Sequence, residues 1–335
     1  MVNRLKRAIQ AEYLAEAGLA HTLGILQADF SGKNNPLNFP LTTLGPGTYD
    51  AAITETNGRV MISSTGAVQG VQRTVKAEVK GPTESALSYI LSGGGKIELK
   101  LSAYATAAIV GNVYANDEIE LKAKAAGSSI VLQNLGNAYA GDDIEVDGNI
   151  TMGSVNPNWS VIGFPVFDYG FYQSVATANG YTYNGDQTFT SANPIPFAPT
   201  GGVIFVNGSM TITASQATTA CLIATGNIDI TQGTVTISQY NDYPALMSQN
   251  GNITIRSVGA VNQGKLAATG LIYAGGNFSM SGNHDWVEIT GAIVARGKLE
   301  ESGTHDTLIL NYQAPNPPGL LSSGATPMTI LSYNT

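Results

Sequence analysis

A block of about eleven residues recurs seven times in this chain, and no other feature of the sequence constrains the fold as strongly. Each copy has a short apolar strand pattern, a break of Gly and Asn residues, and a second strand of alternating character. The copies are GNVYANDEIEL from Gly111, GNAYAGDDIEV from Gly136, GVIFVNGSMTI from Gly202, ACLIATGNIDI from Ala220, ALMSQNGNITI from Ala245, GLIYAGGNFSM from Gly270 and GAIVARGKLEE from Gly291. Apart from one long gap after the second copy, successive copies begin 18 to 25 residues apart. Such a period predicts a solenoid, because one coil buries its apolar face only when another coil stacks on it. Residues 93–315 are therefore expected to form a parallel β-helix.

The register of the coils can be predicted from three segments that align closely: IELK at Ile97, IELK at Ile119 and IEVD at Ile144. If consecutive coils stack in register, these isoleucines point inward and form one column. The residues that follow them then point outward and form a second column of Glu98, Glu120 and Glu145. Gly and Asn stand at the breaks because both tolerate the left-handed backbone of a sharp corner.

The composition excludes several classes of protein. Charged residues make up 12% of the chain, about half of the usual ~25%, and the formal net charge is −8. A chain with this charge does not bind nucleic acids or anionic membranes indiscriminately. Cys221 is the single cysteine, so an intrachain disulfide cannot form, and its apolar surroundings favour a buried position. No apolar run reaches the roughly 18 residues of a membrane-spanning helix.

The first part of the chain predicts a helix followed by an antiparallel meander. Residues Asn3–Phe30 carry apolar side chains at spacings of three and four, which places one set on a single helix face: Leu5, Ile9, Tyr13, Ala17, Ala20 and Leu23. Three strand patterns follow at Thr48–Glu55, Arg59–Ser64 and Val71–Val79, with an Asn-Gly hairpin signal after the first. A last strand pattern, Met328–Tyr333, is expected to return and pair with one of these three, which makes the solenoid an insertion.

The N-terminal stretch AEYLAEAGLAHTL (Ala11–Leu23) resembles the second half of the long helix in minor type IV pilins of the PilX-like group. The following GTYDAAIT and NGRVMISSTGAVQGVQRTVKAEV are similar to the meander of such proteins, and the Gly-rich repeats resemble the β-solenoids of competence-associated minor pilins from thermophilic bacteria. The resemblance implies a mainly β fold with one N-terminal helix, in which a pilin-like α+β module at 1–82 is completed by 326–335. The inserted parallel β-helix domain then spans 83–325 and carries an aromatic-rich insert at 153–201.

The resemblance also bears on the start of the chain and on its location. The leader, the glutamate-containing processing motif and the membrane-embedded first half of the pilin helix have no counterpart before Val2. We therefore expect a truncated helix, a vector-supplied Met1, and membrane contact only through the absent segment. The implied location is an extracellular pilus at the cell surface, with anchoring in the inner membrane before assembly, and the implied partners are other pilins.

The insert between the second and third copies has its own composition, with several prolines and many aromatic residues, from Trp159 to Tyr183. Asp168–Ala178 is a candidate short helix. One interpretation is a flap that packs over one face of the solenoid. The other is an aromatic platform on which sugars or bases stack.

Positive charge is unevenly distributed, and it provides the candidate binding site. Between Lys124 and Arg256 there is no Lys or Arg. One group of cations falls on the first coils, and a second falls on the last: Lys96, Lys100, Lys122 and Lys124, then Arg256, Lys265, Arg296 and Lys298. Stacked lysines are able to follow a phosphate backbone, so these eight residues are the candidate contacts to double-stranded DNA. The alternative is that Lys100 and Lys122 only neutralise the neighbouring glutamate column.

Other chemistry has weaker support in the sequence. The pairs His284–Asp285 and His305–Asp306 are 21 residues apart, as are the copies around them, so they are expected to stack as a ladder or as a divalent-cation site. Polysaccharide-cleaving β-helices use clustered carboxylates near Arg or Ca²⁺, and the candidates here are Asp117–Glu118, Asp142–Asp143 and the glutamate column. No Arg lies between Arg73 and Arg256. We therefore predict no enzymatic activity, no catalytic residue and no cofactor.

The functional hypothesis combines the resemblance with the distribution of charge. It is a minor pilin at or near the tip of a type IV pilus, whose solenoid is a receptor for extracellular DNA in natural transformation. The tip is implied because so large an insertion would clash with neighbouring subunits in a filament shaft. A surface adhesin for glycans or matrix is the alternative, and a polysaccharide-active β-helix enzyme is the third hypothesis.

Overall fold

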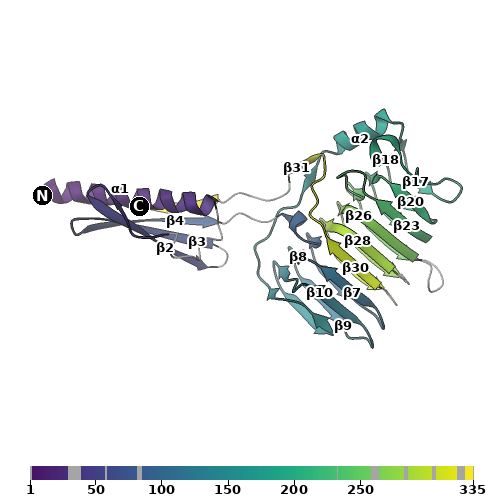
Figure 1. The fold of residues 1–335 in the computed structure, drawn as a ribbon, viewed down its shortest axis with the longest axis horizontal. Coiled ribbons are helices and arrows are strands. Elements are labelled where there is room, and N and C mark those ends of the chain that lie inside the picture. Colours follow the sequence, from purple (N-terminus) through teal and green to yellow (C-terminus); the bar gives the residue numbers. More distant parts are fainter. Residues whose placement is uncertain are drawn as a thin grey trace. The chain divides into compact units, whose positions relative to one another are not determined.

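The computed structural model describes residues 2–28, 39–56, 59–80, 85–231, 233–257, 264–282, 286–303, 307–322 and 329–334. The chain divides into two compact units (Figure 1). The helix–sheet unit comprises Met1–Thr83 and Thr326–Thr335, and the solenoid unit comprises Glu84–Ala325.

The helix–sheet unit packs one long helix on an antiparallel sheet. Helix α1 spans Val2–Ala28, and the sheet has the order β1-β2-β3-β4-β32. Its strands are β1 (Thr42–Leu44), β2 (Gly47–Thr56), β3 (Arg59–Val68), β4 (Val71–Lys80) and β32 (Thr329–Asn334). The predicted return of the chain is confirmed, because Thr329 pairs with Lys80 and Tyr333 pairs with Ala77. Since the solenoid lies between β4 and β32 in the sequence, it is inserted into this sheet.

Helix α1 turns the N-terminal part of its predicted apolar stripe away from the sheet, although Leu23 packs against the buried cluster. Leu5, Ile9 and Tyr13 are 65%, 44% and 66% exposed, whereas the buried side is rich in small residues: Ala8, Ala11, Leu14, Ala15, Leu19 and Leu26. The reason is the close approach of helix and sheet, since a Cβ atom on Gly66 would lie 2.1 Å from the carbonyl oxygen of Ala11.

Among the helices described, none is long and apolar enough to cross a membrane.

The solenoid unit is a parallel β-helix whose coils each contribute to three faces. One face is a nine-stranded sheet with the strands β12 (Ile144–Gly148), β9 (Ile119–Ala123), β6 (Ile97–Lys100), β29 (Leu299–Gly303), β27 (Phe278–Gly282), β25 (Ile253–Ser257), β22 (Ile228–Ile230), β19 (Met210–Ile212) and β17 (Gln187–Phe189). The other two faces join in a 16-stranded sheet.

The 16-stranded sheet has a long path and several side pairings. Its path runs through β13 (Ile150–Thr151), β10 (Ser129–Gln133), β7 (Thr106–Val110), β30 (Thr307–Tyr312), β28 (Trp286–Ala295), β26 (Gly264–Ala274), β24 (Leu246–Ser248), β21 (Cys221–Ala224), β18 (Val203–Asn207) and β16 (Thr182–Asn184). Strands β5 (Leu91–Gly93), β8 (Val113–Ala115), β11 (Ala138–Ala140), β14 (Val155–Asn156), β20 (Gln216–Thr219) and β23 (Gly233–Ser238) pair beside this path.

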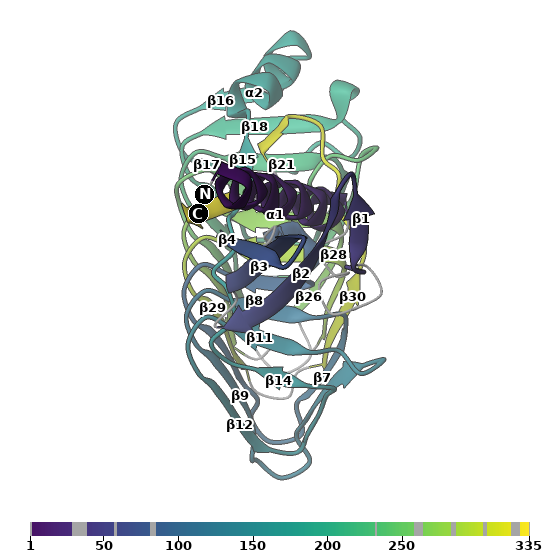
Figure 2. The ribbon, with the colours of Figure 1, turned by 90° about the vertical axis from the view of Figure 1, so that its left-hand side faces the viewer.

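The coils do not stack in sequence order. The coil that contains the last repeat lies beside the first coil, because β29 pairs with β6, β30 with β7, and β28 with β5. The second and third repeats, which are neighbours in the sequence, therefore lie at opposite ends of the solenoid, near β12 and β16 respectively (Figure 2). All of these pairings are parallel, so the superhelix winds in one sense from residue 181 to residue 312 and then continues from residue 85 to residue 156.

The segment at residues 157–181, here called the connecting segment, joins these two ends along the outside of the solenoid. It contains β15 (Val166–Phe167), which pairs with β31 (Leu320–Ser322), and helix α2 (Tyr169–Ala178), whose N-terminus is capped by the Asp168 carboxylate. Its side chains pack on outward-facing residues of the coils in a second apolar cluster, which includes Tyr172 and the buried Cys221. The interpretation of the insert as a flap is confirmed for residues 157–181, whereas β16 and β17 of the same insert form the terminal coil of the solenoid. The burial of Cys221 is confirmed.

The predicted inward column is confirmed in the main core of the solenoid. Ile97 and Ile119 are fully buried, and Ile144 packs on the same cluster although it lies on the terminal coil. That coil ends the described sheet at β12, where Val146 is 41% exposed. The opposite end is covered by α2, which contacts β16 and β18.

Candidate functional site

Four glutamates form a column across neighbouring strands of the nine-stranded sheet. The register pairs Glu300 with Glu98, Glu98 with Glu120, and Glu120 with Glu145. The predicted column of three is confirmed, and it is extended by Glu300 because the coil of β29 lies beside that of β6. Neighbouring strands are about 4.8 Å apart, so this stack of carboxylates would repel itself without compensating charge.

Lysines on the same strands supply that charge. Lys96 Nζ lies 2.6 Å from a carboxylate oxygen of Glu120 and 3.1 Å from one of Glu118. Lys100 Nζ lies 2.6 Å from Glu98 and 3.4 Å from Glu120. The structure therefore brings two of the predicted DNA contacts together, but it places both of them among carboxylates.

The ladder continues on both sides of these residues. Lys122 contacts Glu120 and lies 3.1 Å from Glu145, while Lys298 lies 3.0 Å from Glu98 and 3.1 Å from Glu300. We call this set the lysine–glutamate ladder: Lys96, Lys100, Lys122, Lys298, Glu98, Glu118, Glu120, Glu145 and Glu300. At its edge, Lys124 forms an ion pair with Asp147.

The ladder shifts the protonation equilibria of its most enclosed members. Hydrogen bonds from Lys122 and Lys96 lower the pKa of Glu120 from its ordinary 4.5 to about 2. Burial raises the pKa of Glu98, but hydrogen bonds from Lys100 and Lys298 outweigh it and leave that pKa below its ordinary value. The hydrogen bond to Glu120 raises the pKa of Lys96. These carboxylates stay ionised and these lysines stay charged at neutral pH.

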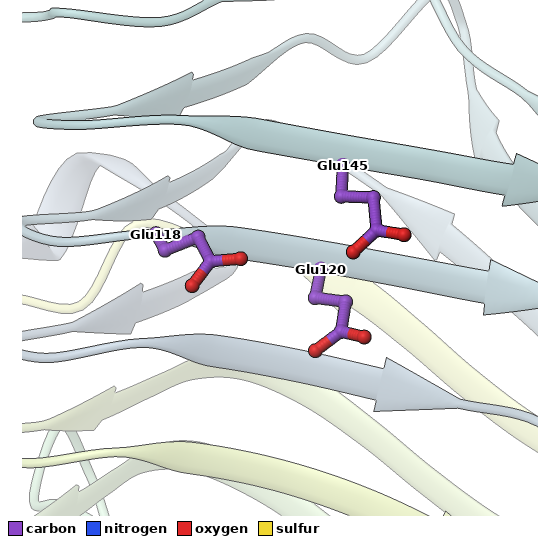
Figure 3. Close-up of side chains that lie close together, drawn as sticks. All are labelled: Glu118, Glu120 and Glu145. Carbon is purple, nitrogen blue, oxygen red and sulfur yellow. The ribbon is translucent and has the colours of Figure 1, made fainter.

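The charges of this region nearly cancel. The five lysines face six carboxylates when Asp147 is included, which leaves a net charge of about −1. Ligand oxygens of Glu118, Glu120 and Glu145 lie within 4.8 Å of one another, which is a spacing that a cation could bridge (Figure 3). All three carboxylates already contact lysine ammonium groups, so a metal ion would have to displace those groups.

The second group of predicted cations is divided in the structure. Lys298 belongs to the ladder, and Arg256 lies 3.0 Å from Asp229 on the neighbouring β22. Arg296 hydrogen-bonds Tyr273, which lies in the outer apolar cluster. Lys265 belongs to β26, in the other sheet, and its side chain lies outside the described part of the chain. Arg256, Arg296 and Lys298 therefore each have a different set of partners in the described part of the chain.

Two further sequence hypotheses can be compared with the structure. The residues His284, Asp285, His305 and Asp306 lie outside the described residues. Trp159 of the aromatic insert is 42% exposed and its ring lies 4.8 Å from that of Tyr139, whereas Tyr172 is fully buried. Most of the aromatic side chains of the insert therefore serve packing, whereas Trp159 and Phe197, at 42% and 68%, are its strongly exposed aromatic residues among those described.

Sequence reasoning missed several members of this region. Glu300 joins the ladder because the coil of β29 lies beside that of β6, and Asp147 of β12 pairs with Lys124, which follows β9. Glu118 is already a candidate carboxylate in the sequence, but its contact with Lys96 is not predicted there. Glu301 is 3% exposed and aligns with the core residues Leu99 and Met280, so it is an inward-facing acid. Alternation from Leu299 predicts this inward position, which is the signal that would have found it.

Comparison with known proteins finds similarity in three-dimensional structure but not in sequence. No protein-family model matches the chain, and no curated protein matches it in sequence. Among solved structures, it is similar to the crystal structure of the competence-associated pilin ComZ from Thermus thermophilus, with 13% sequence identity and a TM-score of 0.48. The match covers 98% of this chain and 97% of that chain.

Proposed function

We propose that this protein is a minor type IV pilin in which the helix–sheet unit joins the filament and the solenoid unit is a receptor for extracellular DNA. The observation that carries the assembly part is the exposed apolar stripe of α1. Val2, Leu5 and Ile9 are 80%, 65% and 44% exposed, although the opposite side of the helix is buried on the sheet. An exposed apolar stripe of this kind is typical of a surface that a partner covers.

The insertion of the solenoid supports a place at or near the pilus tip. The chain leaves the sheet of the helix–sheet unit after β4, forms the solenoid unit, and returns to the sheet as β32. An insertion larger than the unit that carries it is hard to accommodate between closely packed subunits of a shaft. A subunit at the tip has neighbouring subunits on one side only, so an inserted solenoid has room on the other side.

The assembly part is tested by placing a charge on the stripe. We expect the Leu5→Glu and Ile9→Glu variants to be absent from sheared pili while the helix–sheet unit stays folded, because a buried carboxylate in a helix–helix contact is costly. Gln27→Glu is the matched control, since Gln27 is exposed on the same helix and gains the same charge. Pilus recovery of both stripe variants at the level of this control would contradict the proposal.

The receptor part rests on the stacking of Lys96, Lys100, Lys122 and Lys298 on neighbouring coils. Phosphates would have to replace carboxylates as partners of these lysines, so binding should be modest, independent of sequence and strongly reduced by salt. Lys124 is the most accessible of the predicted contacts that form ion pairs in the described region, with 64% of its side chain exposed, and its partner is Asp147.

Removing a competing carboxylate tests this part directly. Glu145→Gln and Asp147→Asn should tighten binding of double-stranded fragments in gel retardation at low salt, because the first removes one of the two carboxylates that contact Lys122 and the second removes the partner of Lys124. Lys124→Ala should weaken binding and flatten the slope of log K against log salt by about 0.9 for each phosphate that is no longer neutralised. Glu288→Gln is the control, because it removes one negative charge elsewhere on the solenoid. If Glu288→Gln tightens binding as much as Glu145→Gln, the ladder is not the site.

The adhesin for glycans or matrix is the second candidate function. The near cancellation of charge in the ladder favours it, because the solenoid then presents mainly neutral polar side chains. A β-helix enzyme has less support, since a general acid needs a raised pKa and that of Glu120 is lowered to about 2.

A further inference from the structure

A trough follows one corner of the solenoid where β26 and β28 bend. Gly270 and Gly291 occupy this corner on consecutive coils, with φ of +110° and +152°. A Cβ atom on Gly291 would lie 2.0 Å from the carbonyl oxygen of Gly270, so the corner has to remain bare. Both residues begin a sequence repeat, and the trough is thus a direct product of the repeat pattern.

Two segments outside the repeats form walls beside this corner and close a cavity of about 240 Å³. One wall follows β23 and provides Gln239 and Asp242, while the other follows β30 and provides Gln313, Pro315 and Asn316. The backbone N–H of Gln239 donates to Thr269 Oγ1 at 2.9 Å, and that of Gln313 donates to the carbonyl oxygen of Gly291 at 3.0 Å. These bonds fix both walls to the coils.

The cavity presents exposed polar side chains, and two of them lack a hydrogen-bond partner among the described residues. The side-chain amides of Gln313 and Asn316 make no hydrogen bond within the part of the chain that the structure describes. The Gln239 side chain donates to one carboxylate oxygen of Asp242 at 3.5 Å, which leaves the other oxygen of Asp242 available. Amide and carboxylate groups of this kind bind hydroxyl groups well, because each offers a planar donor or acceptor edge.

Charge and size narrow the class of ligand. Among the described residues, neither Lys nor Arg lines the cavity, and Asp242 is its charged member, so a phosphate or nucleotide would be repelled. Pro315 adds a partly exposed apolar surface that suits the C–H face of a ring, whereas Leu271 is buried in the outer apolar cluster. The volume is below the ~300–1,000 Å³ of sites for drug-sized ligands and suits one small ring.

We propose that this cavity binds one uncharged saccharide residue through the amides of Gln313 and Asn316 and the carboxylate of Asp242. The proposal deepens the adhesin alternative and does not depend on assembly of the chain into a pilus. It places the sugar contact at the β26–β28 corner, away from the lysine–glutamate ladder of β6, β9 and β29.

Saturation-transfer difference NMR on the whole chain tests the proposal. The probes are the methyl glycosides of glucose, galactose and mannose and N-acetylglucosamine, with adenosine monophosphate as the charged comparison. We expect at least one neutral sugar to receive saturation and adenosine monophosphate to receive none. Gln313→Ala should weaken binding about tenfold, and Ala314→Trp should abolish it by filling the cavity from an exposed position.

The matched control is Gln133→Ala, which removes an exposed glutamine at the end of β10, on a distant coil, and should leave sugar binding unchanged. The proposal is overturned if no neutral sugar in the panel binds, if Ala314→Trp binds as well as the parent chain, or if adenosine monophosphate competes for the cavity. A glycan array that is positive while the cavity variants bind normally would retain the adhesin function and reject this site.

Discussion

At the scale of single residues, Glu120 is the most constrained charge of the ladder. Its side chain is 5% exposed and contacts Lys96, Lys100 and Lys122. An ion pair this enclosed gains little net stability over an apolar replacement, but removing only one partner leaves a costly uncompensated charge. Glu120 therefore does not destabilise the fold only as long as its lysine partners are present.

The pKa of Glu120 predicts how stability depends on pH. The folded-state pKa is about 2, below the ordinary 4.5, so the unfolded chain binds the proton more tightly. The contribution of Glu120 to the free energy of unfolding is complete above about pH 5 and is lost as the pH falls toward 2. We expect Glu120→Gln to show a shallower fall of stability over this range in urea denaturation at a series of pH values. Equal slopes for the variant and the parent chain would contradict the assigned role.

At the scale of elements, the sequence could predict the register of the early strands but not the role of the helix face. The IELK segments predict which side chains of β6 and β9 point inward, because alternation along a strand leaves only two choices. The stripe of Leu5, Ile9 and Tyr13 on α1 is equally regular, yet it is exposed. Periodicity shows that a face is apolar, but it cannot show whether the same chain or another chain covers it.

The small residues of α1 indicate which of its faces packs on the sheet. Ala11 and Ala15 lie over Gly66, and a side chain on Gly66 would collide with the helix backbone. A run of alanines on the opposite side of an apolar stripe is therefore a second candidate for the packed face. The full ladder could not be predicted from the sequence either. Lys298 joins it through the pairing of β29 with β6, which no spacing in the sequence reveals.

At the scale of the whole molecule, the order of the coils could not be predicted from the sequence. Every coil carries the same alternation, so any coil is able to pair with any other, and the repeat pattern does not say which coils are neighbours. The pairing of β30 with β7 decides the order, and it joins residues about 200 positions apart. The connecting segment at 157–181 is what permits this order, because it carries the chain from one end of the solenoid to the other.

The coil order predicts that the solenoid tolerates a rearranged chain. Tyr312 donates a hydrogen bond to the carbonyl oxygen of Leu87 at 2.7 Å, so the end of β30 lies close to the start of the first coil. A permuted solenoid that is opened between Asn156 and Pro157, with residue 312 joined to residue 88 by a short linker, should unfold in one cooperative transition. Circular dichroism during thermal unfolding measures this. A permutant opened inside β26 is the control and should fail to fold; if both behave alike, the continuous winding does not determine stability.

The chain enters and leaves the solenoid near its middle, and this has a mechanical consequence. Strand β5 pairs with β28 and β8, and β30 pairs with β28 and β7, so the first and last strands of the coils each have a neighbour on both sides. A pull transmitted from the helix–sheet unit through the polypeptide reaches the coils at β5 and, after the short β15–β31 pair, at β30. It cannot peel coils one by one from a free end, as it could in a solenoid tethered at its terminal coil, but has to shear two hydrogen-bonded ladders at once.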